Sequence, residues 1–149
     1  MPIRLALVED DPRLRAEYGA IVAGDPEIGL VGAYSSGEEA MAHLPGLAPD
    51  AVLMDINLPG MTGIECVRQL KNVLPSVQVV MLTALGDSET VFESLKAGAT
   101  GYVLKEATGG EVLDAVREVC AGARRSRAPS PASWCSTSRR GEKRRKYRP

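Results

Sequence analysis

Long apolar runs and a cysteine framework are both missing from this sequence of 149 residues. No stretch reaches the roughly eighteen apolar residues that a membrane-spanning helix needs, so we expect no membrane segment. The apolar run near the amino terminus is short and ends in a cluster of acids, which does not fit a secretion signal. The three cysteines, Cys66, Cys120 and Cys135, lack C-x-x-C spacing, so neither a zinc site nor a disulfide framework is predicted. We therefore expect a cytoplasmic protein.

The net charge of −1 conceals two oppositely charged parts. Residues 1–123 hold 8 Lys/Arg and 18 Asp/Glu, a net charge of −10. Residues 124–149 hold 10 Lys/Arg and 1 Glu, a net charge of +9. This second segment is dense in Arg, Ser and Pro and nearly free of aliphatic residues, so it cannot bury enough apolar area to fold. We predict one folded domain at 1–123 and a basic, disordered tail at 124–149.

Strand-like and helix-like patterns alternate along the first part of the chain. Short apolar runs predict five buried strands, at residues 3–8, 28–34, 51–56, 77–82 and 101–105. After four of the strands, apolar residues recur at helical spacing, as in residues 64–74, and residues 35–44 have helical composition. Asp11, just before Pro12, and the serine pair at 35–36 are candidate helix caps. A βα unit repeated five times predicts a doubly wound α/β fold, with a parallel sheet and helices on both faces.

Polar residues with reactive side chains stand where the predicted strands end, and in such sheets the functional crevice lies outside the carboxyl ends of the strands. Crowded carboxylates repel one another, and a divalent cation relieves that repulsion. Oxygen ligands favour magnesium. A hydroxyl and a mobile ammonium beside the acids complete a site for phosphoryl transfer onto a carboxylate. The residues, in chain order, are Glu9, Asp10, Asp11, Asp55, Asn57, Thr83, Ala84 and Lys105.

These residues lie in four motifs that resemble the receiver domain of two-component response regulators. The motifs are LVEDD (7–11), MDINLPGMTG (54–63), MLTA (81–84) and GYVLKE (101–106), and the similarity covers roughly residues 3–122. Asp55 and Thr83 are 28 residues apart, and Thr83 and Lys105 are 22 apart, which also fits the family. The last motif is similar to that of the NarL/LuxR-type branch. The resemblance implies a flavodoxin-like (βα)5 fold, with a five-stranded parallel sheet in the order 2-1-3-4-5.

The resemblance also implies a phosphoacceptor with a magnesium site. Asp55 would accept the phosphoryl group. Asp10 would bind Mg²⁺ directly and Glu9 through water, together with Asp55 and the backbone carbonyl of Asn57. Because Asp11 extends the acidic run, this assignment could slip by one residue, although the first acid after the strand normally begins the pair.

Further residues are implied to bind the phosphoryl group and to transmit its arrival. Thr83, the amide of Ala84 and Lys105 would contact the phosphoryl oxygens. Tyr102 would turn inward as Thr83 moves, which remodels the surface formed by the fourth helix, the fifth strand and the last helix. The chain's only histidine, His43, lies in the predicted second helix, away from these residues. The phosphodonor would therefore be another molecule, which in this family is a sensor histidine kinase.

The tail departs from the family pattern. In this branch a linker and a helix-turn-helix output domain usually follow, but residues 124–149 have too few apolar residues to form one. The tail is either a natural basic arm that contacts nucleic acid nonspecifically or a segment that is not native, such as a frame-shifted one. We expect transcriptional regulation by the full-length parent, no sequence-specific DNA binding by this chain, and a last helix able to pair in a homodimer on phosphorylation.

Two other functions stay open. Phosphatases and ATPases that form an aspartyl phosphate also place the aspartate after a strand, but many use a second acid two residues later, where this chain has Asn57. A stand-alone receiver that acts only through protein–protein interaction is the other alternative. Our preferred interpretation is a signalling phosphoacceptor that is not an enzyme beyond its own phosphorylation and dephosphorylation.

Overall fold

The computed structural model describes residues 2–84 and 88–125, in which five strands and five helices alternate along the chain. The strands are β1 (Ile3–Val8), β2 (Ile28–Tyr34), β3 (Ala51–Asp55), β4 (Gln78–Thr83) and β5 (Gly101–Leu104). The helices are α1 (Pro12–Ala23), α2 (Gly37–Leu47), α3 (Gly63–Val73), α4 (Ser88–Ala97) and α5 (Gly109–Arg125). Each strand begins and ends within one residue of its predicted bounds. Helix α5 continues two residues past the predicted domain end at 123, and the rest of the predicted tail lies outside the described residues.

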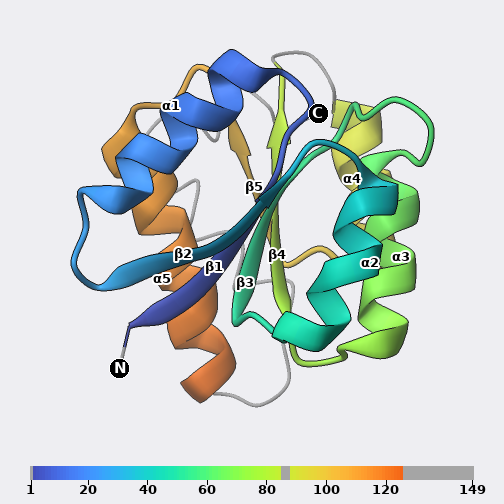
Figure 1. Cartoon of the computed structure of the whole chain (residues 1–149). Helices are drawn as coiled ribbons and strands as arrows, with labels where there is room; N and C mark the ends of the chain where they lie inside the picture. The colour runs from blue at the N-terminus through green and yellow to red at the C-terminus, as the bar shows by residue number, and fades with distance from the viewer. Residues whose placement is uncertain (1, 85–87, 126–149) are drawn as a thin grey trace.

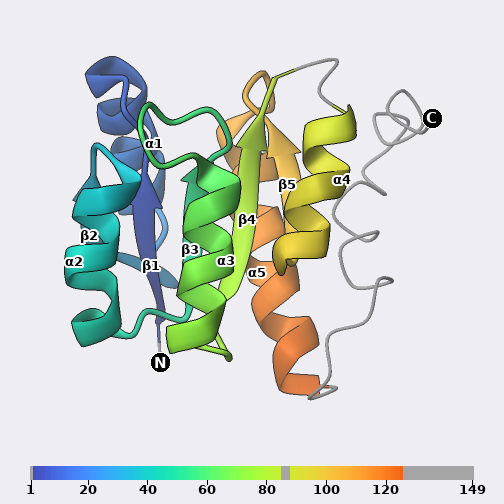
Figure 2. The ribbon, with the colours of Figure 1, turned by 90° about the vertical axis from the view of Figure 1, so that its right-hand side faces the viewer.

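The five strands form one parallel sheet in the order β2-β1-β3-β4-β5, which confirms the predicted fold class. Helices α1 and α5 cover one face of the sheet, and α2, α3 and α4 cover the other (Figures 1 and 2). All carboxyl ends of the strands therefore point to the same edge. Among the residues described, no helix is long and apolar enough to cross a membrane.

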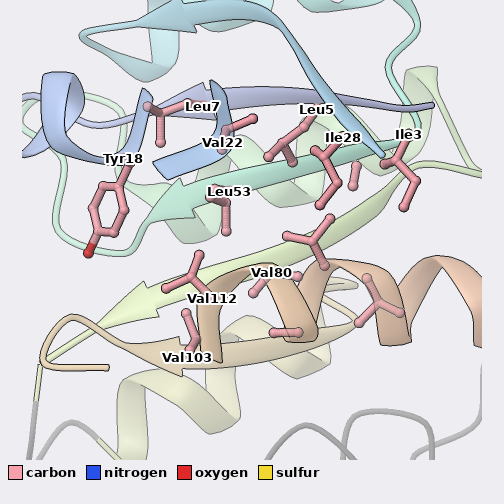
Figure 3. Packing of buried hydrophobic residues seen from close by; sticks show 14 of the residues in the cluster. Ile3, Leu5, Leu7, Tyr18, Val22, Ile28, Leu53, Val80, Val103 and Val112 are labelled. Atoms are coloured by element: carbon pink, nitrogen blue, oxygen red, sulfur yellow. The ribbon is translucent and has the colours of Figure 1, made fainter. Parts of the chain in front are cut away.

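Two apolar layers, one on each face, hold the sheet in place. Successive side chains of a strand point to opposite faces, so Leu53 enters the layer under α1 and α5 while Val52 and Met54 enter the other. Figure 3 shows Leu53 beside Leu7 and Val80 in the first layer. All five residues of β3 are buried. Each large apolar side chain buried in this way contributes about 1.5–3 kcal/mol, so the central strand is firmly fixed.

Side-chain caps fix where the helices begin beside the carboxyl edge of the sheet. The Asp11 carboxylate accepts a hydrogen bond from the Arg13 N–H at 2.9 Å, and Pro12 fills the first turn of α1. Ser36 caps α2 by accepting from the Glu39 N–H at 3.0 Å. Ser35, the other serine of the predicted pair, lies outside the helix and donates to the Glu39 carboxylate.

At the opposite edge, the amino ends of the strands are closed by hydrogen bonds. The Arg4 N–H donates to the Asp50 carboxylate at 2.9 Å, and the Arg4 guanidinium donates to the carbonyls of Leu47 and Ala48 at 2.8 and 2.9 Å. Lys71 Nζ donates to the carbonyls of two residues in the loop before β4, at 2.9 and 2.7 Å. These charged groups bind backbone oxygens that the helix ends and loops would otherwise leave unpaired.

Candidate functional site

Three acids meet at the carboxyl edge of the sheet. Asp55 is the last residue of β3, Glu9 follows β1 directly, and the two strands are neighbours in which Val8 pairs with Met54. The side chains of Glu9 and Asp55 are each 1% exposed, whereas Asp10 is exposed. One carboxylate oxygen from each acid lies within 4.8 Å of the other two. Residues 46 positions apart in the sequence are therefore joined in one anionic cluster.

Lys105, which directly follows β5, places its ammonium group beside this cluster. Its backbone N–H donates to the Thr83 carbonyl at 2.9 Å, which extends the hydrogen bonding of β4 with β5. Its Nζ lies 3.0 Å from Asp55 Oδ1 and 3.8 Å from Glu9 Oε1. The side chain is 26% exposed, so the ammonium is screened from solvent on most sides. One lysine thus contacts two of the three acids.

Thr83 is buried at the end of β4, at the same edge as the acids. Its neighbour Leu82 pairs with Asp55 across the sheet, so Thr83 stands one residue beyond that pair. The Thr83 hydroxyl donates to the Ala84 carbonyl at 3.3 Å. The hydroxyl thus has a weak local acceptor, and exchanging it for a stronger one would cost little.

The other predicted site residues divide into those at the cluster and those away from it. The Asn57 N–H donates to Asp55 Oδ1 at 3.1 Å, which ties the loop after β3 to the carboxylate. Tyr102 lies on β5, partly buried against the apolar layer under α2, α3 and α4. His43 is exposed on α2, where its ring stacks on that of Tyr34 with centroids 5.3 Å apart.

Charge in the cluster is only partly balanced. Burial, joined by repulsion from Asp55, raises the pKa of Glu9 to about 7, although the Asp11 N–H and Lys105 act against this rise. Burial alone would lower the pKa of Lys105, but the carboxylates of Asp55, Glu9 and Asp10 outweigh it and raise that pKa. The cluster therefore contains more negative charge than one ammonium offsets.

The residues present fit a hard divalent cation. Glu9 Oε1 is buried and has no hydrogen-bond partner in the part of the chain that the structure describes. The Lys105 ammonium is 3.8 Å away, too far for a hydrogen bond, so this buried oxygen is costly unless a metal ion or water reaches it. Carboxylate and carbonyl oxygens are the ligands that Mg²⁺ prefers, and it leaves room for waters and a phosphate oxygen. Glu9, Asp10 and Asp55 thus form a suitable donor set.

Arg15 belongs to this site although the sequence analysis did not identify it. Its guanidinium donates to the Glu9 carbonyl at 2.7 Å, directly behind the acidic cluster. The available signal was its position one helical turn after Asp11, whose carbonyl accepts the Arg15 N–H. Spacing alone did not indicate that the side chain turns back toward the strand.

Comparison with known proteins decides the family. The model of the response regulator receiver domain matches residues 5–117. The chain belongs to this family. DevR/DosR of Mycobacterium tuberculosis, a DNA-binding transcriptional activator, is 36% identical over 120 residues, which cover 80% of this chain and 55% of that protein. The response regulator protein VraR of Staphylococcus aureus (strain Mu3) is 34% identical over 122 residues, which cover 82% and 58%.

A solved structure of the family extends the comparison to the fold. The LuxR-family two-component response regulator from Aurantimonas sp. SI85-9A1 superposes with a TM-score of 0.78 at 29% identity, over 93% of this chain and 99% of that one. The predicted NarL/LuxR-type receiver domain is confirmed. The chain is thus a signalling receiver domain, and it spans a little over half the length of the curated relatives it matches.

Proposed function

We propose that the chain accepts a phosphoryl group on Asp55 and signals through the resulting change at its surface. The observation that carries the proposal is the buried Asp55 carboxylate, which Lys105 contacts at 3.0 Å and the Asn57 N–H at 3.1 Å, beside two further acids. His43 is exposed on α2 with its ring stacked on that of Tyr34, and it is not part of the acidic cluster. The donor is accordingly a phosphohistidine on a sensor histidine kinase, which meets the chain in the cytoplasm.

In the transfer step, an Asp55 carboxylate oxygen attacks the phosphorus. The new P–O bond forms as the P–N bond to the donor imidazole breaks, and that nitrogen keeps the electron pair and takes up a proton. Mg²⁺, when bound by Glu9, Asp10, Asp55 and the Asn57 carbonyl, supplies positive charge that the phosphoryl oxygens require. Lys105 Nζ, the Thr83 hydroxyl and the Ala84 N–H stabilise charge on the same oxygens. Attack by water on the phosphorus of the aspartyl phosphate breaks the P–O bond to Asp55, releases inorganic phosphate and returns the carboxylate.

The signal leaves through the surface formed by α4, β5 and α5. A phosphoryl group on Asp55 offers the Thr83 hydroxyl a stronger acceptor than the Ala84 carbonyl that it now contacts at 3.3 Å. Tyr102 then fills the space that Thr83 vacates. Ser94 is the one buried residue of α4, and Phe92 on the same helix is 61% exposed, so α4 is lightly anchored and moves at small cost.

The output we propose is transcriptional, and it belongs to the full-length parent. DevR/DosR is by name a DNA-binding transcriptional activator, and this chain matches a little over half of it. The phosphorylated receiver would control a DNA-binding output domain, with pairing of two receivers through α5 as one route. The receiver alone would bind no specific DNA sequence.

Two aspartates at opposite ends of β3 provide the test of the phosphoacceptor. The wild type, Asp55→Asn and Asp50→Asn are treated with acetyl phosphate and Mg²⁺, and the mass of each intact protein is measured. We expect the mass gain of one phosphoryl group on the wild type and on Asp50→Asn, and none on Asp55→Asn. A labelled Asp55→Asn protein, or an unlabelled wild type, would overturn the proposal. Repeated turnover of a phosphomonoester would favour the phosphatase alternative.

A further inference from the structure

Arg15, in the first turns of α1, donates hydrogen bonds to the acidic loop between β1 and α1. Its Nη1 donates to the Glu9 carbonyl at 2.7 Å and, more weakly, to the Asp10 carbonyl at 3.4 Å. Its backbone N–H donates to the Asp11 carbonyl at 2.9 Å, which is an opening hydrogen bond of α1. One residue therefore contacts three successive carbonyls, and these belong to the three acids at the end of β1.

Glu9 is held independently of this arginine, whereas the peptide group that joins Glu9 to Asp10 is held by it. Glu9 is buried, its N–H donates to the Tyr34 carbonyl at 3.0 Å, and its carboxylate accepts the Asp11 N–H at 3.1 Å. Asp10 is exposed, and no hydrogen bond joins its carboxylate to another residue that the structure describes. The direction of the Asp10 side chain therefore depends on its backbone. Because peptide groups are planar, the bond to the Glu9 carbonyl orients the peptide plane before Asp10, and the weaker bond to the Asp10 carbonyl joins the Asp11 N–H bond to Glu9 in orienting the plane after it.

We propose that Arg15 is a positioning residue that aims the Asp10 carboxylate at the cation beside Asp55. This inference rests on the proposed function, because it assumes that the acids bind a divalent cation. The positive charge of Arg15 allows positioning to be distinguished from simple electrostatics. A guanidinium next to a cation site repels the cation, so by charge alone the site would bind metal better without Arg15. Positioning acts in the opposite direction, so the sign of the change on removing Arg15 distinguishes the two effects.

The test measures metal binding directly, with Mn²⁺ as the probe and free Mn²⁺ counted by electron paramagnetic resonance. Removing a group that orients a metal ligand typically weakens binding 10- to 100-fold, so we expect Arg15→Ala to weaken Mn²⁺ binding by about tenfold. Arg13→Ala is the matched control, because it removes the same charge from an exposed side chain two residues away. It should leave the affinity unchanged or slightly higher. Arg15→Lys keeps the charge but not the planar guanidinium whose Nη1 donates to both carbonyls, and it should fall between wild type and Arg15→Ala.

A second readout separates positioning from general damage to the fold. The Mg²⁺ concentration that half-saturates labelling by acetyl phosphate should rise about tenfold in Arg15→Ala, while excess Mg²⁺ restores the wild-type labelling rate. Mn²⁺ binding by Arg15→Ala as tight as or tighter than wild type would overturn the inference, and so would an equal loss in Arg13→Ala. If Arg15→Ala does not fold, Arg15→Lys decides, since wild-type affinity there contradicts positioning. Absence of label on wild-type Asp55 would instead refute the proposed function.

Discussion

The two edges of the sheet differ in how their charged groups are paired. At the amino ends of the strands, Arg4 and Lys71 donate to backbone carbonyls at 2.7–2.9 Å. At the carboxyl ends, Glu9 has a buried oxygen without a hydrogen-bond partner among the described residues. Both edges contain buried or half-buried charge. At the first edge the charges complete the fold. At the second they crowd around Asp55 with one ammonium between them. The groups that complete the fold and the groups of the candidate site are thus separated along the strands, so substitutions at the two edges should affect different measurements.

The largest effect should come from replacing Lys105, with the other half-buried lysine, Lys71, as the comparison at the amino edge. Lys105→Met removes the ammonium 3.0 Å from Asp55, and losing one stabiliser of transition-state charge lowers a rate by about 100-fold. Lys71→Met should leave labelling by acetyl phosphate unchanged, but it deprives two carbonyls of their donor and should cost about 1–2 kcal/mol of unfolding free energy. Labelling rates and urea titrations of both variants check the contrast. Equal labelling by the two variants would remove the distinction between the edges.

The next largest effect should be on the pH dependence of the unfolding free energy, measured in metal-free buffer with a chelator. The pKa of Glu9 is raised from 4.5 to about 7, so the folded protein holds this proton more tightly than the unfolded chain does. The stabilising contribution of protonated Glu9 is full below pH 4.5 and is lost as pH rises through 7, roughly 3 kcal/mol in total. Glu9→Gln should remove this part of the pH dependence and be the more stable protein at pH 8. Parallel curves of unfolding free energy against pH for Glu9→Gln and wild type would show that the acid is not destabilised by burial.

The smallest effect should come from Arg4→Ala at the amino edge. Its guanidinium donates to the Leu47 and Ala48 carbonyls at the end of α2, but the side chain is exposed. We expect a loss of about 1 kcal/mol in unfolding free energy and no change in acetyl phosphate labelling. Thermal unfolding and the labelling assay, run on the same sample, check both statements. A labelling defect in this variant would show that the two edges are coupled through the sheet.

The sequence was sufficient to predict the strands and helices, and to predict that the polar side chains after the strands lie together. Periodicity gave each strand to within one residue, and a parallel sheet requires that residues after its strands share an edge, which brought Glu9 and Asp55 together without knowledge of the structure. The Asp11 and Ser36 caps were also predicted, because capping depends on a few neighbouring residues.

Features that depend on side-chain conformation could not be predicted. Arg15 has the same charge and helical context as Arg13, and only the packing of α1 decides which of them turns back to β1. The raised pKa of Glu9 depends on how fully its carboxylate is buried, which the residue type does not disclose. The hydrogen bonds of Arg4 and Lys71 join residues through loop shapes that have no periodic signal.

All five residues of β3 are buried, with alternate side chains committed to opposite apolar layers. A single inserted residue would exchange those layers and point the terminal aspartate elsewhere. This part of the gene therefore tolerates substitution of similar volume but neither insertion nor deletion. Protein engineers who wish to alter the receiver can change the solvent faces of the helices, while the strand that presents Asp55 must be kept at its present length.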